Sequence, residues 1–184
     1  MRGPYEAVKV AENIYWVGAI DWKIREFHGY ATHRGTTYNA FLVVADKVTL
    51  IDTVKAPFVD EMMSRVASVV PLGKVDYIIS NHAEMDHSGG LLPAIDAMQP
   101  SKVFASTKGV QALKAHFPNL DFPIDIVPLD EPLDLGGTKL RFIETRMVHW
   151  PDSMFCYAEE AKMLFSQDGF GMHLATSERF ADEI

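Results

Sequence analysis

Cysteine is almost absent from this 184-residue sequence, which contains only Cys156. A single cysteine excludes an internal disulfide framework and any metal site built from several thiolates. Its surroundings, SMFCYA, predict a small buried hydrophobic residue. We therefore expect a reduced, cytoplasmic protein.

Long apolar runs and an excess of basic charge are also missing. No apolar stretch is long enough to cross a bilayer, and the first ten residues, MRGPYEAVKV, lack the apolar centre of a signal peptide. The net charge of −8 argues against nucleic-acid binding, which needs a basic surface. The sequence thus predicts neither a membrane nor a nucleic-acid partner.

The residues that are present describe one globular domain. Hydrophobic residues make up 48% of the chain and charged residues 23%, which suits a protein with a sizeable core. No repeat, low-complexity tract or linker divides residues 1–184. We therefore treat the whole chain as one domain.

Hydrophobic periodicity predicts strands mixed with helices. Strands are expected at 13–20, in a hairpin around Ala45–Lys47, at 75–80, in KVFAS, and from 124 onward in IDIVPL, TKLRFIETR and the hairpin MFCYAEEAKMLFSQD. Helices are expected after Pro57, in LLPAIDAM and in TKGVQALKAHF. This order predicts a layered α/β domain with a mixed or antiparallel sheet.

Four potential metal ligands crowd into six residues of NHAEMDHSGG, directly after the buried strand at 75–80. His82 and Glu84 are two residues apart, so in extended backbone they project to the same side. Asp86 and His87 follow where the chain turns before a helix. Imidazole and carboxylate donors without sulfur suit a borderline metal ion. For any one of these residues alone, a solvated polar loop is the simpler interpretation.

Two further candidates also follow predicted strands. His149 comes after TKLRFIETR, and Asp168 comes after KMLFS. Taken singly, His149 could pack beside Trp150 and Asp168 could belong to a plain turn. Taken with the first cluster, they make six donors at three strand ends.

These motifs resemble those of the metallo-β-lactamase fold proteins and, within them, the flavodiiron proteins of the rubredoxin:oxygen oxidoreductase type. The resemblance covers essentially the whole chain and rests on VGAIDW, FHGYATHRGTTYNAFLV, NHAEMDHSGG, ETRMVHWPDS and SQDGFG. It implies an α/β fold, a metallo-β-lactamase-like αββα sandwich that is incomplete at the C-terminus. Glu84 separates this pattern from that of the zinc hydrolases, which have histidine at this position.

The resemblance implies a diiron site and a role for each candidate. Its two non-haem irons would be held by His82, Glu84 and His149 on one side, by Asp86 and His87 on the other, and by Asp168 as a bridge. His28 and Tyr30 would be catalytic residues beside the site, donating a proton or a hydrogen bond to bound oxygen, and a structural role for His28 is equally open. His33, His116 and His173 are expected to be surface or packing residues.

The implied activity is reduction of oxygen to water, of nitric oxide to nitrous oxide, or both. In the family a rubredoxin-like donor supplies electrons to FMN in a C-terminal flavodoxin-like domain, and head-to-tail homodimers bring FMN to the diiron site. That domain and one further histidine ligand are not found in residues 1–184, so we expect an N-terminal part of a longer protein. The alternatives are a zinc hydrolase of the same fold and a non-catalytic fragment with little metal, which the metal content would distinguish.

Overall fold

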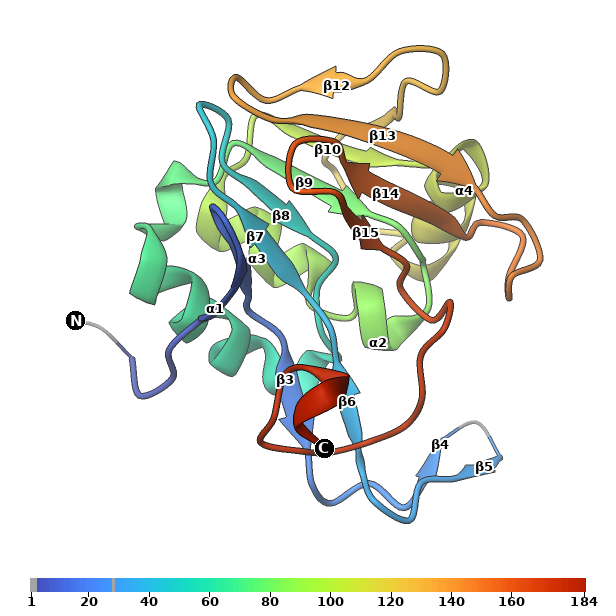
Figure 1. Ribbon diagram of the computed structural model, residues 1–184. Helices are drawn as coiled ribbons and strands as arrows, with labels where there is room; N and C mark the ends of the chain where they lie inside the picture. Colours follow the sequence, from blue (N-terminus) through green and yellow to red (C-terminus); the bar gives the residue numbers. More distant parts are fainter. Residues whose placement is uncertain (1–2, 28) are drawn as a thin grey trace.

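Two β-sheets stack face to face, and helices cover the outer side of the larger sheet (Figure 1). The computed structural model describes residues 3–27 and 29–184. The large sheet has seven strands in the order β1-β2-β7-β8-β9-β10-β11, and the smaller has four in the order β12-β13-β14-β15. Two small ribbons, β3-β6 and β4-β5, extend from one end.

The large sheet consists of β1 (Val8–Ala11), β2 (Ile14–Trp16), β7 (Phe41–Val43), β8 (Thr49–Ile51), β9 (Tyr77–Ser80), β10 (Lys102–Ala105) and β11 (Ile124–Ile126). The small sheet consists of β12 (Leu133–Asp134), β13 (Lys139–Glu144), β14 (Met154–Ala158) and β15 (Met163–Phe165). The ribbons are formed by β3 (Ala19–Asp21), β6 (Thr36–Tyr38), β4 (Glu26–Phe27) and β5 (Tyr30–Ala31).

The helices are α1 (Val59–Val69), α2 (Met85–Ser88), α3 (Leu91–Met98) and α4 (Thr107–His116), with short 3-10 turns at Ala56–Phe58, Leu72–Lys74 and Ala181–Glu183. Helices α1, α3 and α4 connect strands that run parallel, β8 to β9, β9 to β10 and β10 to β11. Parallel neighbours need such crossovers. The carboxyl ends of these strands therefore meet at one edge of the large sheet, where the segment after β9 begins.

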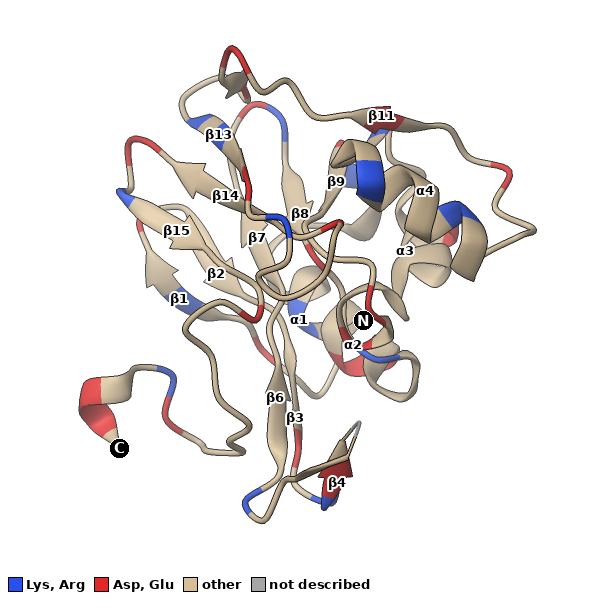
Figure 2. Ribbon diagram, turned by 90° about the vertical axis from the view of Figure 1, so that its right-hand side faces the viewer, with Lys and Arg blue, Asp and Glu red and all other residues tan. Residues whose placement is uncertain are grey.

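The core has two parts because the large sheet is buried on both faces. On one side α1 contributes Met62 and Val66 to a cluster between the helices and the sheet. On the other side Ile79 packs against Phe142 and Phe165 of the small sheet. Figure 2 shows β13 to β15 on one side of the large sheet and α3 and α4 on the other. Within the described part of the chain, no helix covers the outer face of the small sheet, which agrees with an incomplete αββα sandwich.

Most predicted elements are confirmed, including the hairpin around Ala45–Lys47 and the hairpin formed by β14 and β15. The prediction of one strand over 13–20 is wrong, because the chain leaves the large sheet at Val17-Gly18 and β3 pairs with β6 instead. A Cβ on Gly18 would lie 2.0 Å from the carbonyl oxygen of Tyr38, so only glycine fits this crossing. None of the helices in the described ranges combines the length and apolar character needed to cross a bilayer.

Candidate metal centre

The six predicted ligands converge at one end of the stacked sheets. His82 and Glu84 follow β9, and Asp86 and His87 lie on the single turn of α2 rather than in a turn before a helix. The small sheet supplies the other two, because His149 lies between β13 and β14 and Asp168 follows β15. The site therefore depends on the packing of one sheet against the other.

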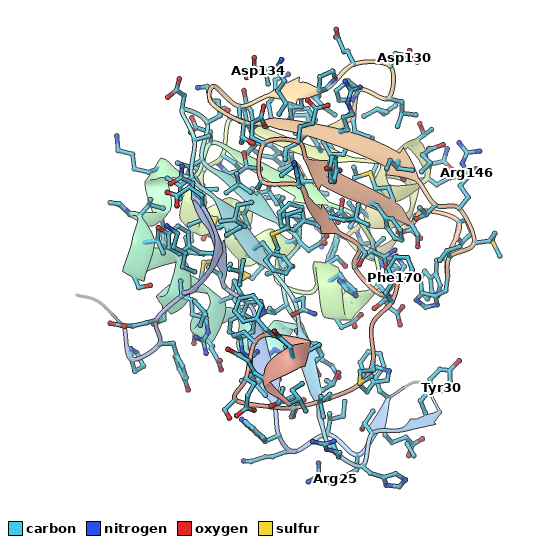
Figure 3. All side chains as sticks on the ribbon, viewed as in Figure 1. Arg25, Tyr30, Asp130, Asp134, Arg146 and Phe170 are labelled. Carbon is cyan, nitrogen blue, oxygen red and sulfur yellow. The ribbon has the colours of Figure 1, made fainter. Side chains whose placement is uncertain are left out.

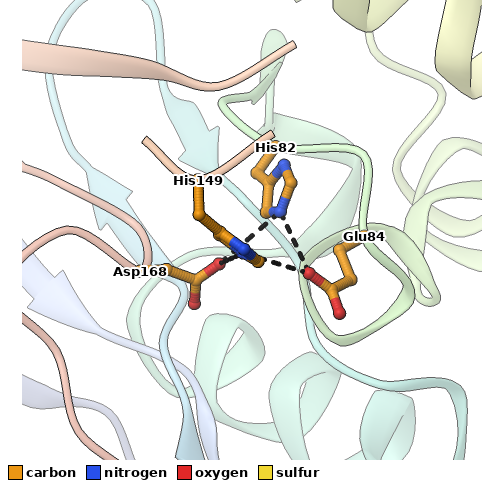
Figure 4. A group of neighbouring side chains, drawn as sticks. All are labelled: His82, Glu84, His149 and Asp168. Atoms are coloured by element: carbon orange, nitrogen blue, oxygen red, sulfur yellow. Dashed lines mark hydrogen bonds and ion pairs between the residues drawn. The ribbon is translucent and has the colours of Figure 1, made fainter. Parts of the chain in front are cut away.

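Four of these side chains form the first cluster, shown in Figure 4: His82, Glu84, His149 and Asp168. Oε2 of Glu84 lies 3.2 Å from Nε2 of His82 and 3.3 Å from Nε2 of His149. Oδ2 of Asp168 lies 3.1 Å from Nε2 of His149 and 3.5 Å from Nε2 of His82. All four ligand atoms lie within 4.8 Å of one another, so they surround one point.

Asp86, His87 and Asp168 form the second cluster. Nε2 of His87 lies 3.0 Å from Oδ1 of Asp168 and 3.6 Å from Oδ2 of Asp86. Oδ1 of Asp86 and Nδ1 of His87 are buried, and the described part of the chain offers them no hydrogen-bond partner. A buried polar atom without a partner is costly, so Oδ1 of Asp86 fits a site that holds another group.

The spacing of the donors fits bound metal ions. Ligands bound at about 2.0–2.1 Å around one ion are separated from their neighbours by about 3.0–3.4 Å. Three of the distances in the first cluster, 3.1 to 3.3 Å, fall within this range, and the fourth is 3.5 Å. Asp168 directs Oδ2 to the first cluster and Oδ1 to the second, which is the arrangement of a bridging carboxylate. The donor set of nitrogen and oxygen suits a first-row transition metal.

Opposed charges shift the pKa values of the buried donors. Burial alone would lower the pKa of His82, but hydrogen bonds to Asp152 and Glu84 raise it to about 10. Burial would likewise lower the pKa of His87, and Asp168 and Asp86 raise it to about 9. For Asp168, burial would raise the pKa, and the hydrogen bond from His87 and the nearby imidazoles hold it well below its usual range. The imidazoles and carboxylates thus stabilise one another's charged forms.

The two residues expected to act beside the metals are placed differently. His28 lies outside the described residues. Tyr30 belongs to β5, is 69% exposed, and has its ring 6.4 Å from that of His173. Figure 3 shows Tyr30 on the ribbon below the sheets, apart from Phe170. A catalytic role for either residue stays a prediction.

Sequence reasoning did not identify two residues that support the first cluster. Asp152 is buried, and its Oδ2 lies 2.9 Å from Nδ1 of His82. His116, expected only at the surface or in packing, has its Nδ1 2.9 Å from the backbone oxygen of Ala83. The only signal for Asp152 was its place in ETRMVHWPDS, three residues after His149, and no local pattern marked His116.

Four large apolar side chains near the ligands in sequence are exposed, and we call them the apolar rim: Met147, Val148, Phe170 and Met172. They flank His149 and Asp168 in sequence, and Phe170 is 91% exposed. The centroid of the Phe170 ring lies 6.1 Å from that of Phe155 on β14. Exposed apolar patches of this kind mark contact surfaces.

The comparisons with known proteins all point to the same family. Residues 36–184 match the family described as ODP family beta lactamase. The chain is 47% identical over 180 residues to rubredoxin-oxygen oxidoreductase of Megalodesulfovibrio gigas and 44% identical over 181 residues to nitric oxide reductase of Moorella thermoacetica. Both matches cover 97% of this chain and 45% of the relative.

Solved structures agree with these sequence matches. The crystal structure of the flavodiiron protein from Giardia intestinalis matches with a TM-score of 0.93 and 38% identity, covering 100% of this chain and 45% of that one. The chain therefore has the fold of these relatives over its whole length, and it spans about 45% of the length of the relatives it matches.

Proposed function

This chain belongs to the ODP family of β-lactamase-like proteins, its relatives are flavodiiron proteins, and from this premise we propose that it forms the diiron domain of an oxygen or nitric oxide reductase. The observation that carries the proposal is the divided orientation of Asp168, whose two oxygens face two different clusters of donors. A shared carboxylate of this kind serves a pair of metals rather than one.

In this proposal each cluster holds one iron. His82, His149 and Glu84 would bind the first, a set of two imidazoles and one carboxylate that is typical of non-haem ferrous sites with open positions. Asp86 and His87 would bind the second, and Asp168 would bridge. When bound, the irons supply the one-electron redox chemistry that reduction of a diatomic gas requires and that zinc lacks.

The chain's own residues set the polarity and the access of the site. Glu84, Asp86 and Asp168 bring three carboxylates to two cations, which favours the oxidised state of the metals electrostatically. His82 and His87 are buried, whereas His149 and Asp168 are partly exposed, so a small molecule would enter beside these two residues. We also propose that His28 and Tyr30 serve as hydrogen-bond or proton donors in the reaction.

Electrons would arrive from outside the described fold. We propose that the remaining length of the whole protein carries one more histidine ligand and an FMN-binding flavodoxin-like domain, with a rubredoxin-type donor delivering electrons. The relatives named rubredoxin-oxygen oxidoreductase and flavorubredoxin support such a donor. We further propose a head-to-tail homodimer in the cytoplasm. The apolar rim would contact the flavin-bearing part of the second subunit, because its four side chains are exposed.

Metal preference and turnover test the proposal. The purified chain is offered equal ferrous iron and zinc without oxygen, and bound metals are counted per chain by mass spectrometry. We expect two metals per chain, a higher proportion of iron than in a Glu84→His chain, and one burst of oxygen uptake when ferrous iron alone is loaded. Sustained oxygen or nitric oxide reduction should require an added FMN-containing flavodoxin-like domain and a reduced rubredoxin. Preferential zinc loading with hydrolysis of a thioester or lactam would instead support the zinc hydrolase, and multiple turnovers without added flavoprotein would contradict the assigned electron route.

A further inference from the structure

Ala83 separates two candidate ligands, and its backbone N–H and C=O groups are both hydrogen-bonded to side chains that belong to neither donor cluster. We propose that Asp152, Ser88 and His116 form an Ala83 clamp, a set of positioning residues that fixes His82 and Glu84 in the geometry required by the first metal. This inference rests on the proposed function only in taking His82 and Glu84 as metal ligands.

The amino side of Ala83 is held by Asp152. Oδ2 of Asp152 accepts a hydrogen bond of 2.7 Å from the Ala83 N–H and lies 2.9 Å from Nδ1 of His82. Because an ionised carboxylate can only accept, Nδ1 of His82 must be the donor. Nε2 then points into the first cluster, toward Glu84 and Asp168. One buried oxygen therefore sets both the ring orientation and the available nitrogen of His82.

The carbonyl side of Ala83 is held by two donors. Oγ of Ser88 donates to the Ala83 oxygen at 2.7 Å, and Nδ1 of His116 donates to the same oxygen at 2.9 Å. The held N–H belongs to the peptide that joins Ala83 to His82, and the held C=O belongs to the peptide that joins it to Glu84. Both peptide planes between the two ligands are thus fixed, which accounts for the 3.2 Å approach of Nε2 of His82 to Oε2 of Glu84.

Helix α4 supports the clamp from both of its ends. At its beginning, Oγ of Ser106 accepts from the Gly109 N–H at 2.9 Å and donates to the backbone oxygen of Asp152 at 2.7 Å. At its end, His116 is the last residue of α4. The clamp therefore connects the segment of His82 and Glu84 to the segment of His149 through one rigid helix.

The burial of Asp152 indicates that its hydrogen bonds to His82 and Ala83 are specific rather than incidental. Asp152 is 3% exposed, and a buried carboxylate is retained only when hydrogen bonds compensate its lost hydration. Removing a hydrogen-bond partner of a ligating histidine typically costs about 10–100-fold in metal affinity. We expect losses of this order for Asp152→Ala, and a several-fold loss for His116→Ala, because Ser88 still holds the Ala83 oxygen.

The experiment measures metal affinity and backbone protection in the same variants. Zinc and ferrous affinities of the chain are determined by chelator competition for the wild type, Asp152→Ala, Asp152→Asn and His116→Ala. His33→Ala, which alters another exposed histidine, is the matched control. Asp152→Asn keeps an oxygen that can accept from the Ala83 N–H, so partial rescue relative to Asp152→Ala is expected.

Hydrogen exchange of the metal-free chain separates positioning from general stability. The Ala83 amide should exchange at least ten-fold faster in Asp152→Ala, whereas the Ile79 amide, in the centre of the large sheet, should be unchanged. Equal acceleration at both amides would mean a structural role only and would overturn the clamp. Unchanged zinc and iron affinity in Asp152→Ala and His116→Ala would overturn it as well. A wild type loaded with ferrous iron that takes up no oxygen would contradict the proposed function and leave the clamp standing.

Discussion

Nε2 of His87 lies 3.0 Å from Oδ1 of Asp168, although 81 residues separate the two in the sequence. The second oxygen of the same carboxylate faces His149 and His82. Loss of Asp168 therefore removes a donor from both clusters, whereas loss of His87 removes a donor from one. This asymmetry gives the first prediction.

Asp168→Ala should abolish the binding of both metals or leave a low and variable metal content. His87→Ala should reduce binding by one metal per chain. The measurement is metal content after anaerobic loading with ferrous iron and gel filtration. Asp130→Ala, which changes an exposed loop carboxylate, is the control and should keep the wild-type content. The same metal loss in Asp168→Ala and His87→Ala would count against a bridging role.

Glu84→His should shift metal preference from iron toward zinc. The carboxylate of Glu84 approaches both His82 and His149, and replacing it with an imidazole removes one negative charge from the first cluster. We expect a lower ratio of iron to zinc when both are offered in equal amounts, together with weaker oxygen uptake. Glu131→His, on the exposed surface, controls for an added histidine. Full iron content and full activity in Glu84→His would show that the role assigned to Glu84 is wrong.

Metal binding should release protons and strengthen with pH well beyond the ordinary range of histidine. Since the pKa values of His82 and His87 are raised to about 10 and about 9, both rings carry an extra proton at neutral pH in the metal-free chain. Each proton must leave before its ring can bind a metal, so loading at pH 7 should release about two protons per chain. A weakly buffered solution with an indicator dye measures this release.

The apparent affinity should therefore keep rising until pH 9–10 instead of levelling near pH 6.5. The same two histidines also make the stability of the metal-free fold depend on pH. A raised histidine pKa stabilises the metal-free fold fully below the unfolded value of about 6.5, and this contribution is lost as the pH rises through the folded values. Constant zinc affinity between pH 7 and 9, in a buffer that does not bind zinc, would refute the prediction.

Phe165→Ala should destabilise the fold far more than Leu164→Ala. Phe165 is 2% exposed and packs between the sheets with its ring 5.0 Å from that of Phe41, whereas Leu164 is 40% exposed on the same strand. We expect a loss of about 3–5 kcal/mol in the free energy of unfolding for Phe165→Ala. For Leu164→Ala the loss should stay below about 1 kcal/mol. Urea unfolding followed by circular dichroism measures both, and similar losses would mean that the two sheets are not packed through Phe165.

Local sequence patterns predict the helices and strands in which the spacing of the hydrophobic residues matches the burial of their side chains. The helix after Pro57 buries Met62 and Val66 at helical spacing, and the hairpin of β14 and β15 alternates along each strand. The strand at 13–20 was mispredicted because its break depends on the close approach of Gly18 to the Tyr38 backbone, which leaves no trace in the residues around Gly18.

The candidate site likewise has residues that the sequence predicts and residues that it does not. His82 and Glu84 were predicted to project together because two-residue spacing in extended backbone determines their direction, and the structure places their donor atoms 3.2 Å apart. Asp152 and His116 could not be predicted, since they reach Ala83 across 69 and 33 residues of sequence. Contacts of that range depend on the packing of α4 and the small sheet, which hydrophobic periodicity does not specify.

The convergence of both sheets on one site also fixes when the site can exist during protein synthesis. His82 to His87 leave the ribosome with the large sheet, and Asp168, 81 residues later, arrives only after the small sheet has been translated. At roughly 5–20 residues per second, this interval lasts about 4–16 s. At the start of this interval the nascent chain presents two of the four donors of the first cluster and two of the three donors of the second, which can hold an ion only loosely. Insertion of the proposed irons would therefore be a late event that follows the docking of the second sheet.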